Sequence, residues 1–235
     1  CGGHGYLESA GFYTLYKLAV TYQTYEGDNV VLLLQTARFL LKSFERARSK
    51  KLLIRGVSYF EDYVNRKGKR LTFDDTLGGI LQAIQAAAAG KVESAWISIE
   101  RKNKIYSIEE ATNQTGIELV RAAELHCHAF LLETAIDELE LAIRSSSPAL
   151  GEVFKQILEL FAVDKLLNLI GDVIQFVEVS NDEIEKLQNR LENSLKFFRT
   201  TALGLVDGFD YSDTILGSTL GSYDGNVYEK LFEAA

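Results

Sequence analysis

Apolar residues recur at helical spacing along nearly the whole chain. The longest stripe covers residues 117–144, where apolar positions at i, i+3 and i+4 continue for about eight turns. Alternation of the kind that indicates a strand is weak, and the single proline, Pro148, breaks few elements. The pattern predicts an all-α fold with no sheet of three or more strands. Further helices are expected at residues 29–48, 77–102, 150–179 and 184–206.

Local signals predict where several of these helices begin and end. The stretch "SSSP" at residues 145–148 should end the long helix. "SNDE" is a capping box, with Ser180 as N-cap and the Glu183 side chain reaching back to it. Gly90 is expected to interrupt helix 77–102, and further glycines should divide the tail, residues 211–235, before a short last helix.

The composition of residues 51–76 differs from that of the segments on either side. Two glycines and a basic cluster interrupt the helical pattern, which predicts a linker there. Residues 1–50 are then interpreted as the end of one helical domain, and residues 77–235 as a second domain, a helical bundle. Within that bundle the Ala-rich stretch "AIQAAAAG" offers a close-packing face, which we expect to serve a dimer.

Charge and cysteine content limit the classes of partner. The 235 residues carry a net charge of −8, and the pI near 5.1 argues against a nucleic-acid partner. The dense basic runs at 46–55 and 65–70 are typical of solvated helix ends or linkers. Two cysteines make no disulfide framework and favour a reducing compartment. No apolar run reaches membrane-spanning length without a charge, so no membrane span is expected.

The stretch "ELHCH" invites interpretation as a metal site, because Glu124, His126, Cys127 and His128 are all possible ligands. On a helix, however, His126 and His128 point to different faces. Glu124 and His128 share a face, but two groups do not make a site. We therefore expect no metal, and a place for both histidines on the surface or in the interior of the bundle.

Two carboxylates, Glu26 and Asp28, bracket Gly27 at the entrance to helix 29–48. They serve either as a helix cap or in chemistry. Asp28 or Asn29 is a good N-cap, and a carboxylate suits the positive end of a helix. The first turns of that helix are apolar around most of the circumference, which predicts burial between neighbours. The aromatic residues of the preceding segment have the composition of a core: Phe12, Tyr13, Tyr16, Tyr22 and Tyr25.

The chain opens on "CGGHGY", and "YEG" stands at the entrance to helix 29–48. A glycine turn, a helix and then Tyr-Glu-Gly resemble the C-terminal helical domain of the acyl-CoA dehydrogenase and oxidase superfamily. The His in "CGGHGY", the run "YEGDNVVLLLQTARFLLK" and the segment "LGSTLGSYDGNVYEKLFE" are similar to the acyl-CoA oxidase branch. The resemblance covers both ends of the chain, and it implies that this sequence is the C-terminal part of a longer protein.

The resemblance implies an activity for that longer protein. Glu26 would remove the α-proton of a fatty acyl-CoA, and a hydride would pass to FAD, giving trans-2-enoyl-CoA. Molecular oxygen would then be reduced to hydrogen peroxide, within peroxisomal fatty acid β-oxidation. An apolar helix mouth that Tyr22 and Tyr25 line would raise the proton affinity of this carboxylate.

The resemblance also implies roles for the neighbours of Glu26. Gly2 and Gly3 match the turn that approaches the FAD of a neighbouring subunit, so a homodimer is expected. Asp28 would contact the flavin as well as cap the helix, and Tyr25 and Gly27 would adjoin the substrate. Dehydrogenases of the superfamily have Thr and Gln where this chain has Asp28 and Val30, a difference that puts the contact at Val30 in question.

Two alternatives remain open at the level of sequence. One is an acyl-CoA dehydrogenase that passes electrons to a protein acceptor, against which the second helical domain argues. The other is a non-catalytic helical dimerisation module, a description that fits residues 77–235 taken alone.

Overall fold

The helices that apolar spacing predicts are present in the computed structural model, which describes residues 1–234. Helix α2 spans Asn29–Arg48, α4 spans Leu77–Lys102 and α6 spans Gly116–Ser145. Two-residue strands, β1 (Leu71–Thr72) and β2 (Val177–Glu178), pair in parallel and make the sheet of the described part. The predicted all-α class is confirmed. Ala235, the last residue of the predicted bundle, lies outside the described residues.

The remaining elements are shorter or lie nearer the ends of the chain. They are η1 (Gly2–Tyr6), η2 (Glu8–Ala10), α1 (Phe12–Thr21), η3 (Arg55–Val57), α3 (Tyr59–Asn65), α5 (Ile108–Asn113), α7 (Pro148–Asn168), α8 (Ile170–Val173), α9 (Asn181–Asp207), α10 (Asp213–Leu216) and α11 (Val227–Glu233).

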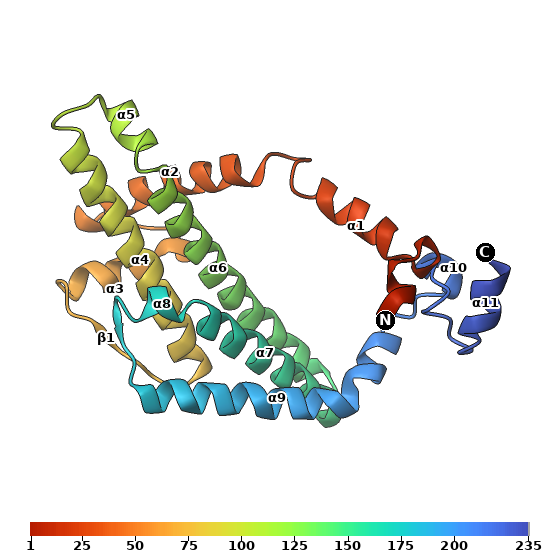
Figure 1. Ribbon diagram of the computed structural model, residues 1–235. Helices are drawn as coiled ribbons and strands as arrows, with labels where there is room; N and C mark the ends of the chain where they lie inside the picture. Colours follow the sequence, from red (N-terminus) through yellow and green to blue (C-terminus); the bar gives the residue numbers. More distant parts are fainter. Residues whose placement is uncertain (235) are drawn as a thin grey trace. The chain divides into compact units, whose positions relative to one another are not determined.

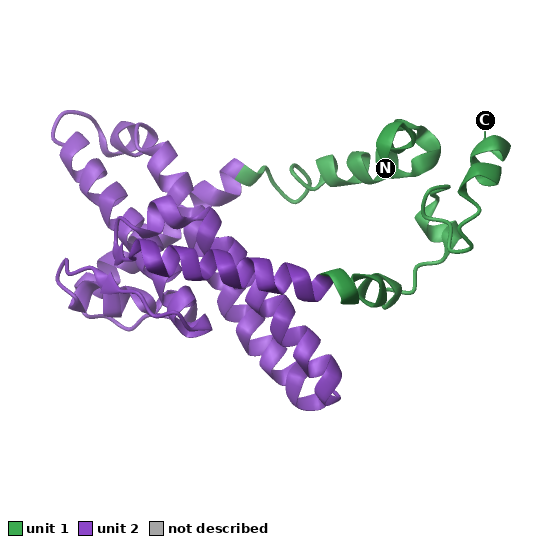
Figure 2. Cartoon of the chain, turned by 60° about the horizontal axis from the view of Figure 1, so that its bottom comes forward, with its two compact units in different colours: residues 1–29, 199–235 green, residues 30–198 purple. Residues whose placement is uncertain are grey.

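The chain divides into two compact units, which Figure 2 distinguishes by colour. One unit comprises residues 1–29 and 199–235, and the other comprises residues 30–198. The first therefore joins the two ends of the sequence, and the second contains the long helices. The division into sequence domains around a linker at 51–76 stays a prediction, although α3, within that segment, contributes the fully buried Phe60 to the core of the second unit.

The core of the second unit lies between α4, α6 and α7, which run side by side (Figure 1). Ala86, Ala87, Ala88 and Ala89 are at most 1% exposed on α4. Small side chains let neighbouring helices approach closely, so this Ala-rich face packs inside the chain. The expectation that it serves a dimer interface is therefore wrong.

Helix α4 runs without a break through Gly90, contrary to the predicted interruption. Gly90 is buried, and a Cβ built there would lie 2.2 Å from the ring of Phe176. The glycine thus makes room for an aromatic ring from the segment before β2. Its cost in helix propensity, about 1 kcal/mol relative to alanine, is offset by this packing.

We expect Gly90→Ala to destabilise the chain by about 1–3 kcal/mol, because the new methyl group displaces the Phe176 ring. Urea unfolding followed by circular dichroism measures this change. Gly171→Ala provides a matched control on α8, since nothing lies within 4 Å of a Cβ built there. A gain in stability from Gly90→Ala, as helix propensity alone predicts, would contradict the packing role.

The predicted end of the long helix at "SSSP" is confirmed, since α6 ends at Ser145, and so is the capping box at Ser180. Ser147 Oγ accepts a hydrogen bond from the backbone N–H of Leu150, with Pro148 in the first turn of α7. In the capping box, Ser180 N donates to Glu183 Oε2 at 2.6 Å, and Glu183 N donates to Ser180 Oγ at 3.2 Å. The predicted single helix at 150–179 is wrong, because the chain forms α7, then α8, then β2. Pairing of β2 with β1 replaces the last helical turns.

The first turns of α2 are exposed in this chain, contrary to the predicted burial. Val30, Val31 and Leu32 are 53%, 54% and 46% exposed. Burial starts further along the helix, where Ala37, Leu40, Ser43, Phe44 and Ala47 lie in the core. These positions follow i, i+3, i+4 spacing, so α2 buries one face in its second half.

Candidate functional site

Glu26 lies in the turn between α1 and α2, in an unusual backbone conformation. Its φ is 65°, and the φ of Gly27 is 125°. The first value is left-handed and costs a non-glycine residue on the order of 1–3 kcal/mol; the second is typical of glycine. The turn is held by backbone hydrogen bonds from Tyr25 N to Thr21 O at 3.1 Å and from Gly27 N to Thr24 O at 3.3 Å. Left-handed φ values also occur at three other exposed non-glycine residues of the described part, so the value at Glu26 defines the turn without marking it as functional.

Two tyrosines adjoin this turn. The rings of Tyr22 and Tyr25 lie 5.0 Å apart between centroids, at 52°. Loss of hydration and the neighbouring Tyr22 hydroxyl raise the pKa of Tyr25, although its side chain is 47% exposed. The expectation that the aromatic residues of this region form a core is wrong, because Phe12, Tyr13 and Tyr16 are also about half exposed or more. Aromatic surface next to a carboxylate suits a substrate with an apolar part.

Asp28 directly precedes α2, at the N-cap position that the sequence predicts. Tyr25, Glu26, Gly27 and Asp28 are therefore consecutive in one turn. Gly2 and Gly3 lie in η1, and η2 separates them from the start of α1, whose ten residues are about 15 Å long. The predicted site residues thus form two groups, one before this helix and one after it.

The glycine turn at the start of the chain leaves its backbone open. Gly2 has a φ of 57°, and no atom lies within 4 Å of a Cβ built at Gly2 or Gly3. A flat group such as a flavin or adenine ring can approach backbone of this kind closely. The open backbone at Gly2 and Gly3 therefore leaves room for a ring of the FAD that the resemblance implies.

The structure joins the segment between this turn and α1 to the C-terminal segment, a contact that the sequence did not predict. Thr219 N donates to Ser9 O at 2.8 Å, and Ser218 Oγ donates to Ala10 O at 2.7 Å. A Cβ at Gly11, where φ is 80°, would lie 3.2 Å from Gly217 O. The segment "LGSTLG", residues 216–221, therefore holds the residues directly before α1. Its similarity to the same family as "CGGHGY" was the signal that could have paired the two.

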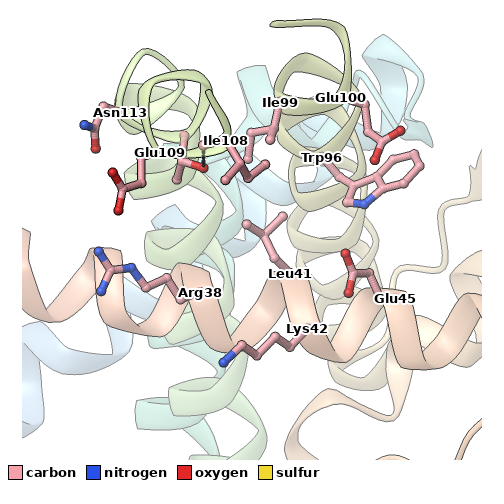
Figure 3. A pocket seen from close by; sticks show the side chains of 11 residues that line it. Arg38, Leu41, Lys42, Glu45, Trp96, Ile99, Glu100, Ile108, Glu109 and Asn113 are labelled. Carbon is pink, nitrogen blue, oxygen red and sulfur yellow. Dashed lines mark hydrogen bonds between the residues drawn. The ribbon is translucent and has the colours of Figure 1, made fainter. Parts of the chain in front are cut away.

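A separate cavity of about 370 Å³ lies in the second unit, between α2, α4 and α5 (Figure 3). Its centre is apolar, with Leu41, Ile99 and Ile108, and Trp96 stands at one end. Charged side chains surround this centre: Arg38, Lys42, Glu45, Glu100 and Glu109. None of the predicted site residues lines it, so it belongs to a different part of the molecule.

The histidines of "ELHCH" pack within the bundle on different faces of α6. His126 is buried, and its Nδ1 lies 3.0 Å from the Tyr59 hydroxyl. His128 is half-buried on another face of α6. Within residues 1–234 no group of three or more His, Cys, Asp or Glu side chains could hold a metal ion. Both Cys1 and Cys127 are free thiols, and burial raises the pKa of Cys127.

Burial of His126 predicts a loss of stability in mild acid. Burial lowers the pKa of His126 in the folded chain, so the unfolded chain binds its proton more tightly. Its contribution is present above the unfolded pKa of about 6.5 and falls as the pH drops through that value. We expect the free energy of unfolding to decrease between about pH 7.5 and 5.5, and this decrease to be smaller in His126→Gln. An unchanged slope in urea titrations of the variant would contradict this assignment.

Family models match most of the chain. The model described as acyl-CoA oxidase matches residues 76–235, and the model of the acyl-CoA oxidase C-alpha1 domain matches residues 1–41, which include Glu26. None of the helices in residues 1–234 is long and apolar enough to cross a membrane.

Similar proteins have the same description. Acyl-coenzyme A oxidase 1 of Drosophila melanogaster is 46% identical over 235 residues, and human peroxisomal acyl-coenzyme A oxidase 1 is 35% identical over 248 residues. This chain is covered completely in both comparisons but spans 35% and 36% of those proteins, about a third of their length.

Solved structures agree on the fold. Acyl-CoA oxidase-2 of Caenorhabditis elegans, bound with FAD, ascaroside-CoA and ATP, matches with a TM-score of 0.89 at 31% identity, covering 100% of this chain and 34% of that one. An acyl-CoA oxidase from tomato matches with a TM-score of 0.88 at 31% identity, covering 100% and 36%.

Proposed function

Because the chain belongs to the acyl-CoA oxidase family, we propose that it is the C-terminal part of an FAD-dependent acyl-CoA oxidase in which Glu26 is the catalytic base. The observation that carries this proposal is the exposed Glu26, next to Tyr25 in the turn before α2, inside the segment that the C-alpha1 model matches. The substrate would be a fatty acyl-CoA and the product trans-2-enoyl-CoA.

The residues of this chain would act on one proton. The α-proton beside a thioester is a poor acid, so its base must be held close and in a fixed direction. The left-handed φ of Glu26 and the adjacent Gly27 set the direction in which the Glu26 side chain leaves the backbone. Closure of the tyrosine-lined mouth by the acyl chain would remove water and raise the proton affinity of Glu26. The backbone N–H of Glu26 would help to hold the thioester oxygen as negative charge develops there.

Three residues of this chain would adjoin the cofactor. Gly2 and Gly3 offer open backbone to the FAD of a partner subunit, and Asp28 lies two residues from the base. FAD, when bound, accepts a hydride from the β-carbon and passes electrons to oxygen. This assignment requires a homodimer, for which exposed apolar side chains on α1, such as Leu15, Tyr16 and Leu18, offer surface. Sedimentation of an active monomer would refute the dimer.

Peroxide formation by the full-length protein tests the proposed reaction. With a fatty acyl-CoA and oxygen alone, we expect enoyl-CoA and hydrogen peroxide to form in equal amounts, measured by absorbance and by a peroxidase-coupled dye. Enoyl-CoA formation only with an added electron acceptor would instead support a dehydrogenase. No turnover under either condition would support a non-catalytic module.

We also propose that the protein resides in peroxisomes and acts in fatty acid β-oxidation. The support is the naming of the human and rat relatives, each 35% identical, as peroxisomal enzymes. Microscopy of the tagged full-length protein with a peroxisomal marker tests the location, and a diffuse distribution would refute it.

A further inference from the structure

Positive charge is concentrated in one short part of this acidic chain. Residues 46–70 hold nine of the 25 Lys and Arg residues and two of the 33 Asp and Glu residues. This segment therefore carries a charge of +7, and the rest of the chain carries −15. Within residues 1–234, Arg55 is the one cation of the nine that forms a salt bridge, with Glu133 and Asp137.

Helix ends explain only some of these cations. Arg46 and Arg48 lie in the last turn of α2, where a positive charge suits the helix dipole. Arg70 donates to the backbone carbonyl oxygens of Ile174 and Val177, and so has a structural role. Neither explanation applies to Lys51 or Lys69, which lie beyond the last turns. The interpretation of the basic runs as solvated helix ends thus does not account for all of the positive charge in residues 46–70.

A cavity of about 410 Å³ opens in this positively charged region, at the C-terminal end of α3, and both polar and apolar side chains line it. Side chains of α3 and of the residue after it form one side, and two glutamines of α4 form another. Its lining residues are Tyr59, Asp62, Asn65, Arg66, Leu71, Gln82, Gln85 and Ala86. The amide side chains of Asn65, Gln82 and Gln85 make no hydrogen bond within the part of the chain that the structure describes, so their donors are available.

Arg66 supplies an independent observation at the same cavity. Its Nε is buried, and among residues 1–234 it has no hydrogen-bond partner. The guanidinium lies against the ring of Tyr63, 5.6 Å from the centroid. Because Nε is buried, a ligand in the cavity reaches the terminal nitrogens of the guanidinium instead, and these also make no hydrogen bond or salt bridge among residues 1–234. The two terminal nitrogens of a guanidinium match an oxyanion in a bidentate arrangement.

We propose that this cavity binds a small, soluble organic phosphate, with Arg66 as its anchor. The amides of Asn65, Gln82 and Gln85 donate further hydrogen bonds to the phosphate oxygens or to the organic part. Asp62 also lines the cavity, but it is exposed, so water screens its repulsion. Its carboxylate can accept a hydrogen bond from a hydroxyl or amino group of the same ligand.

A neighbouring cavity extends the positive surface. Asn65 lines it too, together with Arg48, Lys50 and Lys51. The two basic runs, which are separate in the sequence, therefore adjoin cavities that share one residue. A ligand with a second phosphate group would gain from these lysines, so pyrophosphate should bind more tightly than phosphate.

Calorimetry on the full-length protein with inorganic pyrophosphate and inorganic phosphate tests the proposal. We expect pyrophosphate to bind saturably, with a Kd below about 1 mM. Arg66→Gln should weaken it by about tenfold or more, and Arg66→Lys should weaken it less, because lysine keeps the charge but not the planar fork. Lys67→Gln, which removes the same charge outside both cavities, should change the affinity by about twofold at most.

Two results of the calorimetry would overturn the proposal: no saturable binding, or equal weakening by Arg66→Gln and Lys67→Gln, which would indicate diffuse charge only. Vesicles of an anionic phospholipid test whether the ligand is a lipid headgroup. If the unchanged protein binds these vesicles but not pyrophosphate, and Arg66→Gln abolishes the vesicle binding, a soluble ligand is refuted. If Arg66→Gln fails to fold, the exposed Gln82→Glu places a repelling carboxylate in the cavity. Unchanged pyrophosphate affinity in Gln82→Glu would refute the site.

Discussion

Replacing Glu26 with glutamine in the full-length protein should slow flavin reduction by an acyl-CoA by a factor of roughly 10² to 10⁴, the usual contribution of a general base. Glutamine keeps the shape of the side chain but cannot accept the α-proton. The variant should still fold, bind FAD and bind acyl-CoA, because the turn is held by backbone hydrogen bonds. Stopped-flow absorbance of the flavin under anaerobic conditions measures the step directly.

Two comparisons make the Glu26 result specific. Glu45→Gln removes an exposed carboxylate from the same stretch of chain and should leave flavin reduction unchanged. Asp28→Asn keeps a good N-cap and should cost at most about 1 kcal/mol of stability. Near-normal flavin reduction in Glu26→Gln would refute the assigned base. If Asp28→Asn loses the reaction instead, the roles of the two carboxylates are reversed.

Periodicity was enough to predict the long helices, because each buries a stripe at 3.6-residue spacing. The helix end at "SSSP" and the cap at Ser180 were also predictable, since such signals depend on a few neighbouring residues. Gly90 shows the limit of such local information. Its propensity predicts a break, but the reason for the glycine is the Phe176 ring, 86 positions further along the chain.

Contacts between distant segments account for the other differences. The Ala-rich face of α4 packs inside the chain rather than in a dimer, and sequence spacing cannot tell those two partners apart. The pairing of Ser9 and Ala10 with Thr219 and Ser218 joins the two ends of the chain, and no local pattern encodes it. The two-residue strands are likewise too short for an alternating pattern.

The candidate site was predictable only through motifs. No composition or spacing rule separates Glu26 from 32 other acidic residues, whereas "YEG" after a glycine turn and a helix does so by resemblance. The left-handed φ of Glu26 became visible only in the structure. Arg66 shows the opposite case: its charge was evident within a basic run, but its buried, unpartnered Nε was not.

Replacing Phe60 with alanine should reduce the free energy of unfolding of the chain by about 3–5 kcal/mol. Phe60 is fully buried on α3, its ring 5.7 Å from that of Phe44 on α2 and 4.7 Å from that of Tyr59. Alanine would leave a cavity where these rings meet. Urea unfolding followed by circular dichroism measures the loss, with Leu52→Ala as control, because Leu52 is 85% exposed in the same segment.

The Phe60 result also decides how residues 51–76 behave. In a true linker, substitutions change stability by about 0.5 kcal/mol or less, since few contacts cross such a segment. Phe60 instead connects α3 to the same core as α2 and α4. If Phe60→Ala costs no more than Leu52→Ala, the segment is a linker, and α3 only rests on the core. A loss several kcal/mol larger would mean that the helical domains on either side are joined through α3, and that movement between them requires unpacking this ring.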